Sequence, residues 1–150
     1  MPERNVAIVI FYDDKENIVF QERGSASKIG EKYGLWGGQI ETGETSDQAI
    51  RRELMEELGF VPEKLDFWCN YSSITLEKGK YNGWKINHAV FISPITTKLE
   101  KAHVYEGTGI VKMTIDEAIK SKGFSIGGTE FLKKFKKEFY DEQKLDISNF

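Results

Sequence analysis

The chain has 150 residues and a net charge of −3, which excludes a general electrostatic attraction to nucleic acid or to anionic membranes. Hydrophobic residues make up 39% and charged residues 30%, which is ordinary for a soluble globular chain, and the length predicts one domain with a proper core. Cys69 is the only cysteine, so an intramolecular disulfide is excluded and a reducing compartment is favoured. Neither a signal peptide nor a membrane-spanning apolar run is recognisable, and a cytoplasmic protein is expected.

The N-terminal part of the chain predicts two strands followed by a long loop. Residues 6–11 are typical of a buried strand, residues 13–17 of a turn, and residues 18–21 of a second strand. Residues 24–32 are polar and contain glycine, so we expect a loop there.

A helix of about thirteen residues is predicted between Thr45 and Gly59. Thr45 is followed three residues later by Gln48, which has the form of a capping box. Gly59 supplies a stop signal at the C-terminal end. Apolar residues at helical spacing predict that one face of this helix is buried; they are Ile50, Leu54 and Leu58.

Three glutamates of the predicted helix should lie together beside that buried face. Glu53, Glu56 and Glu57 stand at positions i, i+3 and i+4, so they share one arc of the helix. Like charges this close repel, and a partly desolvated cluster costs more unless a cation neutralises it. Mg²⁺ prefers carboxylate and carbonyl oxygens and keeps positions open for substrate phosphates, so the cluster predicts metal-assisted phosphate chemistry. The alternative is a solvated acidic face without a ligand, and the glycine pair Gly37-Gly38 that precedes the helix counts against it.

Beyond this helix the sequence predicts three more strands and two helices. The strands are expected at residues 65–71, 84–93 and 109–113, and the helices at residues 115–121 and 129–144. This order of elements predicts a mixed sheet with helices on both faces, although it does not fix how the strands pair.

The segment from Gly38 to Phe60 resembles the Nudix box, so the chain is similar to the Nudix hydrolase superfamily. The pattern is G-x5-E-x7-R-E-U-x-E-E-x-G-U, where U is apolar, and its positions are filled by Gly38, Glu44, Arg52, Glu53, Leu54, Glu56, Glu57 and Gly59. Phe60 stands where an aliphatic residue is usual, and Trp36 stands where most members carry proline. The tryptophan either adds an aromatic face near the substrate or packs in the core, and packing is favoured. The resemblance implies the Nudix fold, an α/β/α sandwich with a mixed β-sheet.

The resemblance also implies an activity, namely hydrolysis of a nucleoside diphosphate linked to another moiety, with Mg²⁺ or Mn²⁺ as cofactor. The catalytic group it implies consists of Arg52, Glu53, Glu56 and Glu57. The three glutamates would bind the metal, and Glu53 is also the candidate base that acts on water. A carbonyl of the glycine pair, assigned to Gly37, would complete the metal shell, and Arg52 would hold a neighbouring glutamate in place.

Residues outside the box are expected to add to the site. Glu106 is the candidate for a further metal-binding acid, with Glu100 as the second choice and a solvated loop acid as the alternative. The candidate substrate-binding residues are Arg23, Leu35, Trp36, Gly37 and Gly38. Arg23 suits phosphate oxygens, because guanidinium donors match their geometry, or else it is a solvent-facing arginine at the end of a strand.

The sequence leaves the substrate open. An oxidised nucleoside triphosphate is one candidate, while a dinucleoside polyphosphate, an ADP-ribose-like compound and a nucleotide sugar are others. Two other classes of protein are alternatives: a non-catalytic nucleotide-binding Nudix module, and an isomerase of the isopentenyl diphosphate type that would use Cys69. The intact box counts against the first, and the position of Cys69 after the box counts against the second. The expected partner is a small nucleotide, with a weak case for nucleic acid and none for a membrane, and the protein should be a monomer or homodimer.

Overall fold

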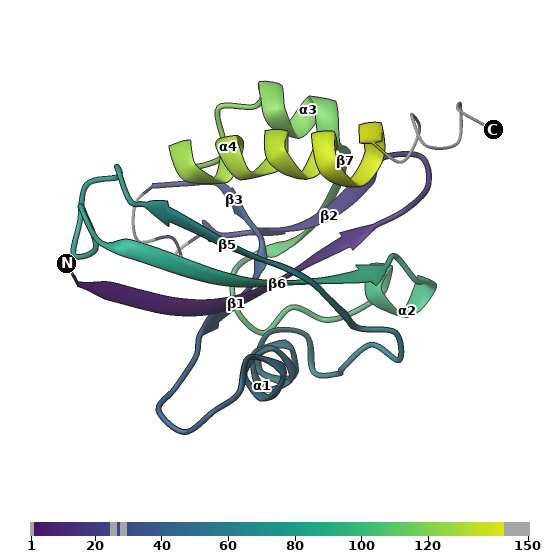
Figure 1. Ribbon diagram of the computed structural model, residues 1–150. Coiled ribbons are helices and arrows are strands. Elements are labelled where there is room, and N and C mark those ends of the chain that lie inside the picture. Colours follow the sequence, from purple (N-terminus) through teal and green to yellow (C-terminus); the bar gives the residue numbers. More distant parts are fainter. Residues whose placement is uncertain (1, 25–26, 28–29, 143–150) are drawn as a thin grey trace.

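The computed structural model describes residues 2–24, 27 and 30–142 of the chain, and its framework is a seven-stranded mixed sheet (Figure 1). The strands are β1 (Glu3–Tyr12), β2 (Asn17–Glu22), β3 (Tyr33–Gly34), β4 (Trp36–Gln39), β5 (Asp66–Ile74), β6 (Lys85–Pro94) and β7 (Gly109–Thr114). The helices are α1 (Ser46–Leu58), α2 (Thr97–Glu100), α3 (Ile115–Lys120), α4 (Ile126–Phe135) and the π-helix η2 (Lys136–Asp141).

The central strand of the sheet is β1, which pairs with three other strands. The main order is β3-β2-β1-β6-β5, with β7 alongside β2. Strand β6 runs parallel to β1 from the pair Glu3–Lys85 to the pair Tyr12–Pro94. On the other edge of β1, β4 pairs with its first half and β2 with its end. The glycine pair of the box therefore lies in β4, directly beside the centre of the sheet.

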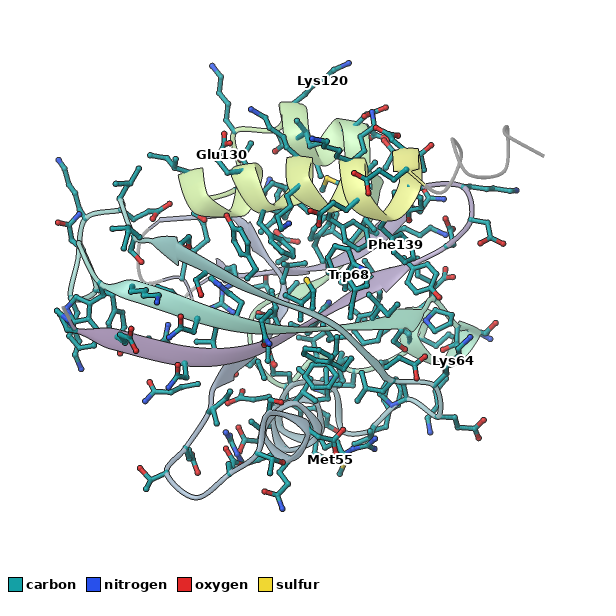
Figure 2. The ribbon with its side chains drawn as sticks, viewed as in Figure 1. Met55, Lys64, Trp68, Lys120, Glu130 and Phe139 are labelled. Atoms are coloured by element: carbon teal, nitrogen blue, oxygen red, sulfur yellow. The ribbon has the colours of Figure 1, made fainter. Side chains whose placement is uncertain are left out.

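Helices cover both faces of this sheet, as Figure 1 shows. Helix α1 lies under one face, where its side chains Ile50, Leu54 and Leu58 join a buried cluster with Val9 and Phe91. Helices α3, α4 and η2 lie over the opposite face. There Trp68 of β5 packs against Phe139, with ring centres 6.1 Å apart (Figure 2). The prediction of a mixed sheet with helices on both faces is confirmed.

Helix α1 agrees with the sequence-based prediction at both ends. The Thr45 hydroxyl accepts a hydrogen bond from the backbone N–H of Gln48, while the Gln48 side chain accepts one from the backbone N–H of Thr45. At the other end, Gly59 has a φ of 76° and donates its N–H to the carbonyl of Met55. These two caps define where the helix begins and ends, and the packing of its apolar residues determines which side faces the sheet.

Two predictions for other elements need correction. The last helix begins at Ile126 and not at residue 129, because the Ser125 hydroxyl caps it by accepting from the N–H of Gly128. The glycines before residue 129 thus lie in the first turn instead of in a loop. The end predicted for that helix at residue 144 falls outside the described residues. Strand β4 falls on a stretch for which the sequence predicts no strand, yet it pairs with β1 in regular register. Within the described residues, no helix combines the length and apolar character that crossing a membrane requires.

Candidate active site

The glycine pair of β4 allows the backbone to lie unusually close to two other parts of the molecule. Gly37 has a φ of 130°, and a Cβ atom there would overlap the carbonyl oxygen of Ala7 in β1. A Cβ atom on Gly38 would lie 2.6 Å from the carboxylate carbon of Glu53. Because neither position has room for a side chain, the carboxylate of Glu53 lies directly against the backbone of β4.

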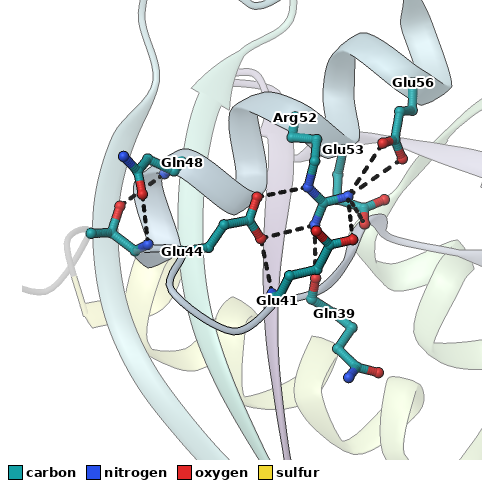
Figure 3. Close-up of polar contacts among 8 residues, drawn as sticks. Gln39, Glu41, Glu44, Gln48, Arg52, Glu53 and Glu56 are labelled. Atoms are coloured by element: carbon teal, nitrogen blue, oxygen red, sulfur yellow. Dashed lines mark hydrogen bonds and ion pairs between the residues drawn. The ribbon is translucent and has the colours of Figure 1, made fainter.

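Arg52 is the centre of a charged network that joins α1 to the loop before it (Figure 3). Its Nε donates to Oε2 of Glu44 at 2.7 Å and its Nη2 to Oε1 of the same carboxylate at 3.0 Å, which makes a bidentate pair. Nη2 also donates to the carbonyl of Gln39 at 2.9 Å. Nη1 donates to Oε1 of Glu53 at 2.9 Å and lies 3.3 Å from Oε1 of Glu56. The hydrogen bond from Arg52 lowers the pKa of Glu44.

Glu57 is the most buried acid of the site, with only 1% of its surface exposed. Its Oε1 accepts a hydrogen bond of 2.9 Å from the backbone N–H of Gly37. Burial, together with the negative charges of Glu106 and Glu53, nevertheless raises the pKa of Glu57 to about 8 against the lowering effect of the Gly37 hydrogen bond. Burial also raises the pKa of Glu53, which its contact with Arg52 only partly offsets. For both carboxyl groups the effect of burial therefore outweighs that of the nearby arginines, Arg52 for Glu53 and Arg23 for Glu57.

The structure brings Glu106 and Arg23 to the same acidic group. The charge of Glu106 acts on both Glu53 and Glu57, and that of Arg23 lowers the pKa of Glu57. Arg23 also forms an ion pair with Glu31 at 3.4 Å. By contrast Glu100, the second choice for a further acid, forms an ion pair with Lys112 at 3.5 Å on the exposed surface. This arrangement favours Glu106 over Glu100.

Two of the candidate substrate-binding residues have their side chains in the protein interior. Trp36 is fully buried, and its Nε1 donates to the carbonyl of Val19 at 3.1 Å. Its ring meets that of Phe11 edge-on. Leu35 is half-buried and packs with the apolar cluster on the α4 side of the sheet. For Trp36 this geometry favours the packing interpretation over a stacked substrate base.

Cys69 does not lie with the acidic residues. It is half-buried in β5 and packs against the cluster on the α4 face, whereas α1 covers the opposite face. Burial raises the pKa of its thiol, which disfavours the thiolate that a nucleophile needs. This position adds to the case against an isomerase that would depend on Cys69.

Sequence reasoning missed one residue of this region, Gln21. It is fully buried at the end of β2, where its side-chain N–H donates to the carbonyl of Glu106 and its oxygen accepts from Arg23. In the sequence it is a polar residue at the end of the predicted strand 18–21, between Phe20 and Glu22. Nothing there marks it as buried, because its partners come from Arg23 and from the distant loop around Glu106.

The donor set suits a hard divalent cation, although the side chains are arranged for other contacts. Across residues 2–24, 27 and 30–142, no three His, Cys, Asp or Glu side chains are arranged so as to hold a metal ion. Arg52 occupies oxygens of Glu53 and Glu56, and Glu57 is turned towards Gly37. Burial raises the pKa of both Glu53 and Glu57, and a bound cation would favour their charged forms. The residues therefore fit a metal by their chemistry and would have to change their present contacts to gather around it.

Comparison with known proteins gives a consistent result. The family described as NUDIX domain matches residues 1–124. An 8-oxo-dGTP diphosphatase of Escherichia coli (strain K12) is 34% identical over 82 residues, a match that spans 51% of this chain and 64% of that relative. A MutT protein from Methanosarcina mazei Go1 superposes with a TM-score of 0.72 at 17% identity, covering 93% of this chain and 96% of the other. A MutT NUDIX hydrolase from Burkholderia pseudomallei superposes with a TM-score of 0.68 at 20% identity, covering 89% of this chain and 98% of the other. At these identities the two structures demonstrate a shared fold, and the match to the Escherichia coli relative spans less than two thirds of that protein.

Proposed function

Because the chain belongs to the Nudix family, we propose that it is a nucleotide pyrophosphohydrolase, which cleaves a nucleoside diphosphate linked to another moiety. The observation that carries this proposal is the group formed by Glu53 and Glu57 against the glycine pair. Two desolvated carboxyl groups with raised pKa values lie against the backbone of β4, Glu53 beside Gly38 and Glu57 at the N–H of Gly37. Groups of this kind concentrate at functional sites.

The residues that would hold Mg²⁺ or Mn²⁺ are Glu53, Glu56, Glu57, Glu106 and the carbonyl of Gly37. When bound, the metal supplies charge neutralisation at the phosphate oxygens and lowers the pKa of water. Glu53 is the candidate proton acceptor for the attacking water, since a carboxyl group with a raised pKa is a better base than an ordinary one. Arg52 keeps Glu53 oriented through its hydrogen bond, and Arg23 is the candidate contact for a substrate phosphate or base.

A nucleoside triphosphate of the oxidised-guanine type is the first substrate to test. The relative named as an 8-oxo-dGTP diphosphatase supports it, as does the proximity of Arg23 to the acidic group. Dinucleoside polyphosphates, ADP-ribose and nucleotide sugars are the other members of the class. A single domain, a cytoplasmic location and a monomeric or homodimeric state remain predictions.

The deciding experiment measures phosphate and pyrophosphate release from this panel with Mg²⁺, with Mn²⁺ and with EDTA. The control is Glu53→Gln, which keeps the size of the side chain and its contact with Arg52 but removes the base. We expect metal-dependent turnover of one substrate class by the wild type and a loss of two or more orders of magnitude, roughly, in Glu53→Gln. A folded protein that binds nucleotide and hydrolyses no member of the panel would favour the non-catalytic binding module instead.

A further inference from the structure

Gln21 joins two parts of the proposed site that come from distant positions in the sequence. Its side chain has no exposed surface, and both ends of its carboxamide are used. The N–H donates to the backbone carbonyl of Glu106, 85 residues away, and the oxygen accepts from Nη1 of Arg23. One side chain thus contacts both the loop that carries the candidate metal-binding acid and the candidate substrate arginine.

The loop around Glu106 rests on this end of β2. Gly107 has a φ of 87°, and a Cβ atom there would lie 2.5 Å from the carbonyl oxygen of Glu22 and 3.2 Å from the Gln21 side chain. The N–H of Thr108 donates to the same carbonyl of Glu22 at 2.8 Å. On its other side the loop is held by α1, because Tyr105 donates its N–H to the carbonyl of Glu57 at 2.9 Å. The loop is therefore hydrogen-bonded to β2 on one side and to α1 on the other, and the side chain of Gln21 supplies one of its hydrogen bonds to β2.

Only a neutral side chain with a donor and an acceptor can make both contacts of Gln21. A carbonyl oxygen needs a donor and a guanidinium needs an acceptor, and a carboxamide offers one of each at its two ends. Both hydrogen bonds are partly buried, where leaving a polar group without its partner is costly. Arg23 and the backbone of Glu106 are therefore held by the same side chain.

We propose that Gln21 is a positioning residue that couples substrate binding at Arg23 to metal binding at Glu106. The proposal rests on the hydrolase function given above and adds to it a residue outside the box. Arg23 would then bind the substrate phosphate and Glu106 the metal, with the position of each depending on the other. Neither residue belongs to helix α1, which carries the main candidate ligands.

The test compares three variants of the full chain with the wild type. Gln21→Met has a similar volume and makes neither hydrogen bond. Gln21→Glu keeps an acceptor for Arg23 and loses the donor to Glu106. Ser93→Ala is the matched control, because Ser93 is also fully buried and donates to a loop carbonyl, that of Lys64 at 2.7 Å, away from the acidic group.

Three quantities are measured: the Mn²⁺ dissociation constant by electron paramagnetic resonance, amide hydrogen exchange over residues 105–108, and the KM of the substrate found in the panel. We expect Gln21→Met to raise both the Mn²⁺ dissociation constant and the KM by about tenfold and to speed exchange in the loop. In Gln21→Glu the loop should exchange faster while the KM stays near that of the wild type. Ser93→Ala should leave all three unchanged.

A folded Gln21→Met with wild-type Mn²⁺ affinity, KM and loop exchange would overturn the proposal, as would equal changes in Ser93→Ala. If Gln21→Met does not fold, Gln21→Glu decides, and unchanged loop exchange in that variant rejects the coupling. If the wild type hydrolyses nothing in the panel, the proposed function fails separately, because Mn²⁺ binding and exchange still report on Gln21.

Discussion

Glu57 combines a nearly complete loss of solvent contact with two acidic neighbours. Its hydrogen bond from Gly37 stabilises the charged form, but burial and the charges of Glu106 and Glu53 outweigh that bond. In the protein without metal this carboxyl group is therefore more stable with its proton than without it. A bound cation would reverse the preference, which is how a metal site can be made from a group that is costly on its own.

The raised pKa of Glu57 predicts how the stability of the metal-free protein depends on pH. The pKa of Glu57 is about 8 in the folded protein, against the ordinary value of 4.5. Because the folded value is the higher one, its contribution to stability is complete below 4.5 and is lost as the pH rises towards 8. The free energy of unfolding in EDTA should thus fall across this window, by at most about 1.4 kcal/mol per pH unit.

Urea unfolding at several pH values checks this dependence. Glu57→Gln is the control, because an amide of the same size cannot lose a proton and can still accept from Gly37. The variant should show a shallower fall with pH than the wild type. Equal slopes in the two proteins would show that Glu57 does not titrate in this window.

At the scale of elements, the tightest constraint is the approach of β4 to β1 on one side and to α1 on the other. The two glycines serve different neighbours: Gly37 faces backbone of β1, and Gly38 faces the flexible end of the Glu53 side chain. Backbone cannot move away without breaking the sheet, whereas a side-chain end can rotate. Substitutions at the two positions should therefore fail in different ways.

Gly37→Ala should mainly destabilise the fold, and Gly38→Ala should mainly impair catalysis. We expect Gly37→Ala to lower the free energy of unfolding by at least about 2 kcal/mol, since it adds strain at positive φ to a clash with Ala7. Gly38→Ala should cost less stability but lower kcat, because it displaces the Glu53 carboxylate. Chemical unfolding and steady-state kinetics of both variants check this, and the opposite pattern would refute the assignment of the two neighbours.

Elements with a clear local signal were predictable, including α1 and most of the strands, whereas β4 was not. Helix α1 follows from a capping box and a terminal glycine, both of which act within a few residues. Strand β4 reads as a loop because two of its four residues are glycine, and only its register with β1 makes it a strand. The start of α4 differs from the prediction because the glycines after Ser125 indicate a loop, whereas the Ser125 hydroxyl caps the helix there.

On the scale of the whole molecule, the sheet separates an α1 face with the acidic site from an α4 face with its own core. The sequence predicted both layers and the residues of the box, since these depend on periodicity and a known pattern. It could not predict the parallel pairing of β1 with β6 or the approach of Glu106 to Glu57. Both depend on contacts between distant segments, which no local pattern encodes.

Trp36 shows how the core and the site depend on each other. Its fully buried ring supports β4 from beneath the glycine pair. We expect Trp36→Leu to lower the free energy of unfolding by about 2 kcal/mol or more, through the cavity and the unpaired carbonyl of Val19. Activity on every substrate should fall in the same proportion, as measured by kcat/KM on two substrate classes. A loss confined to one class would instead place the ring against the substrate base.

The parallel pair of β1 and β6 has a consequence for the order in which the chain can fold. During synthesis the first strand leaves the ribosome long before its neighbour, because Glu3 pairs with Lys85 and Tyr12 with Pro94. Until β6 has emerged, one edge of the central strand β1 has no partner, and the nascent chain must keep its apolar side chains from associating with other chains. The glycine pair aligns on that same strand, so the carboxylates can gather only once the centre of the sheet has closed.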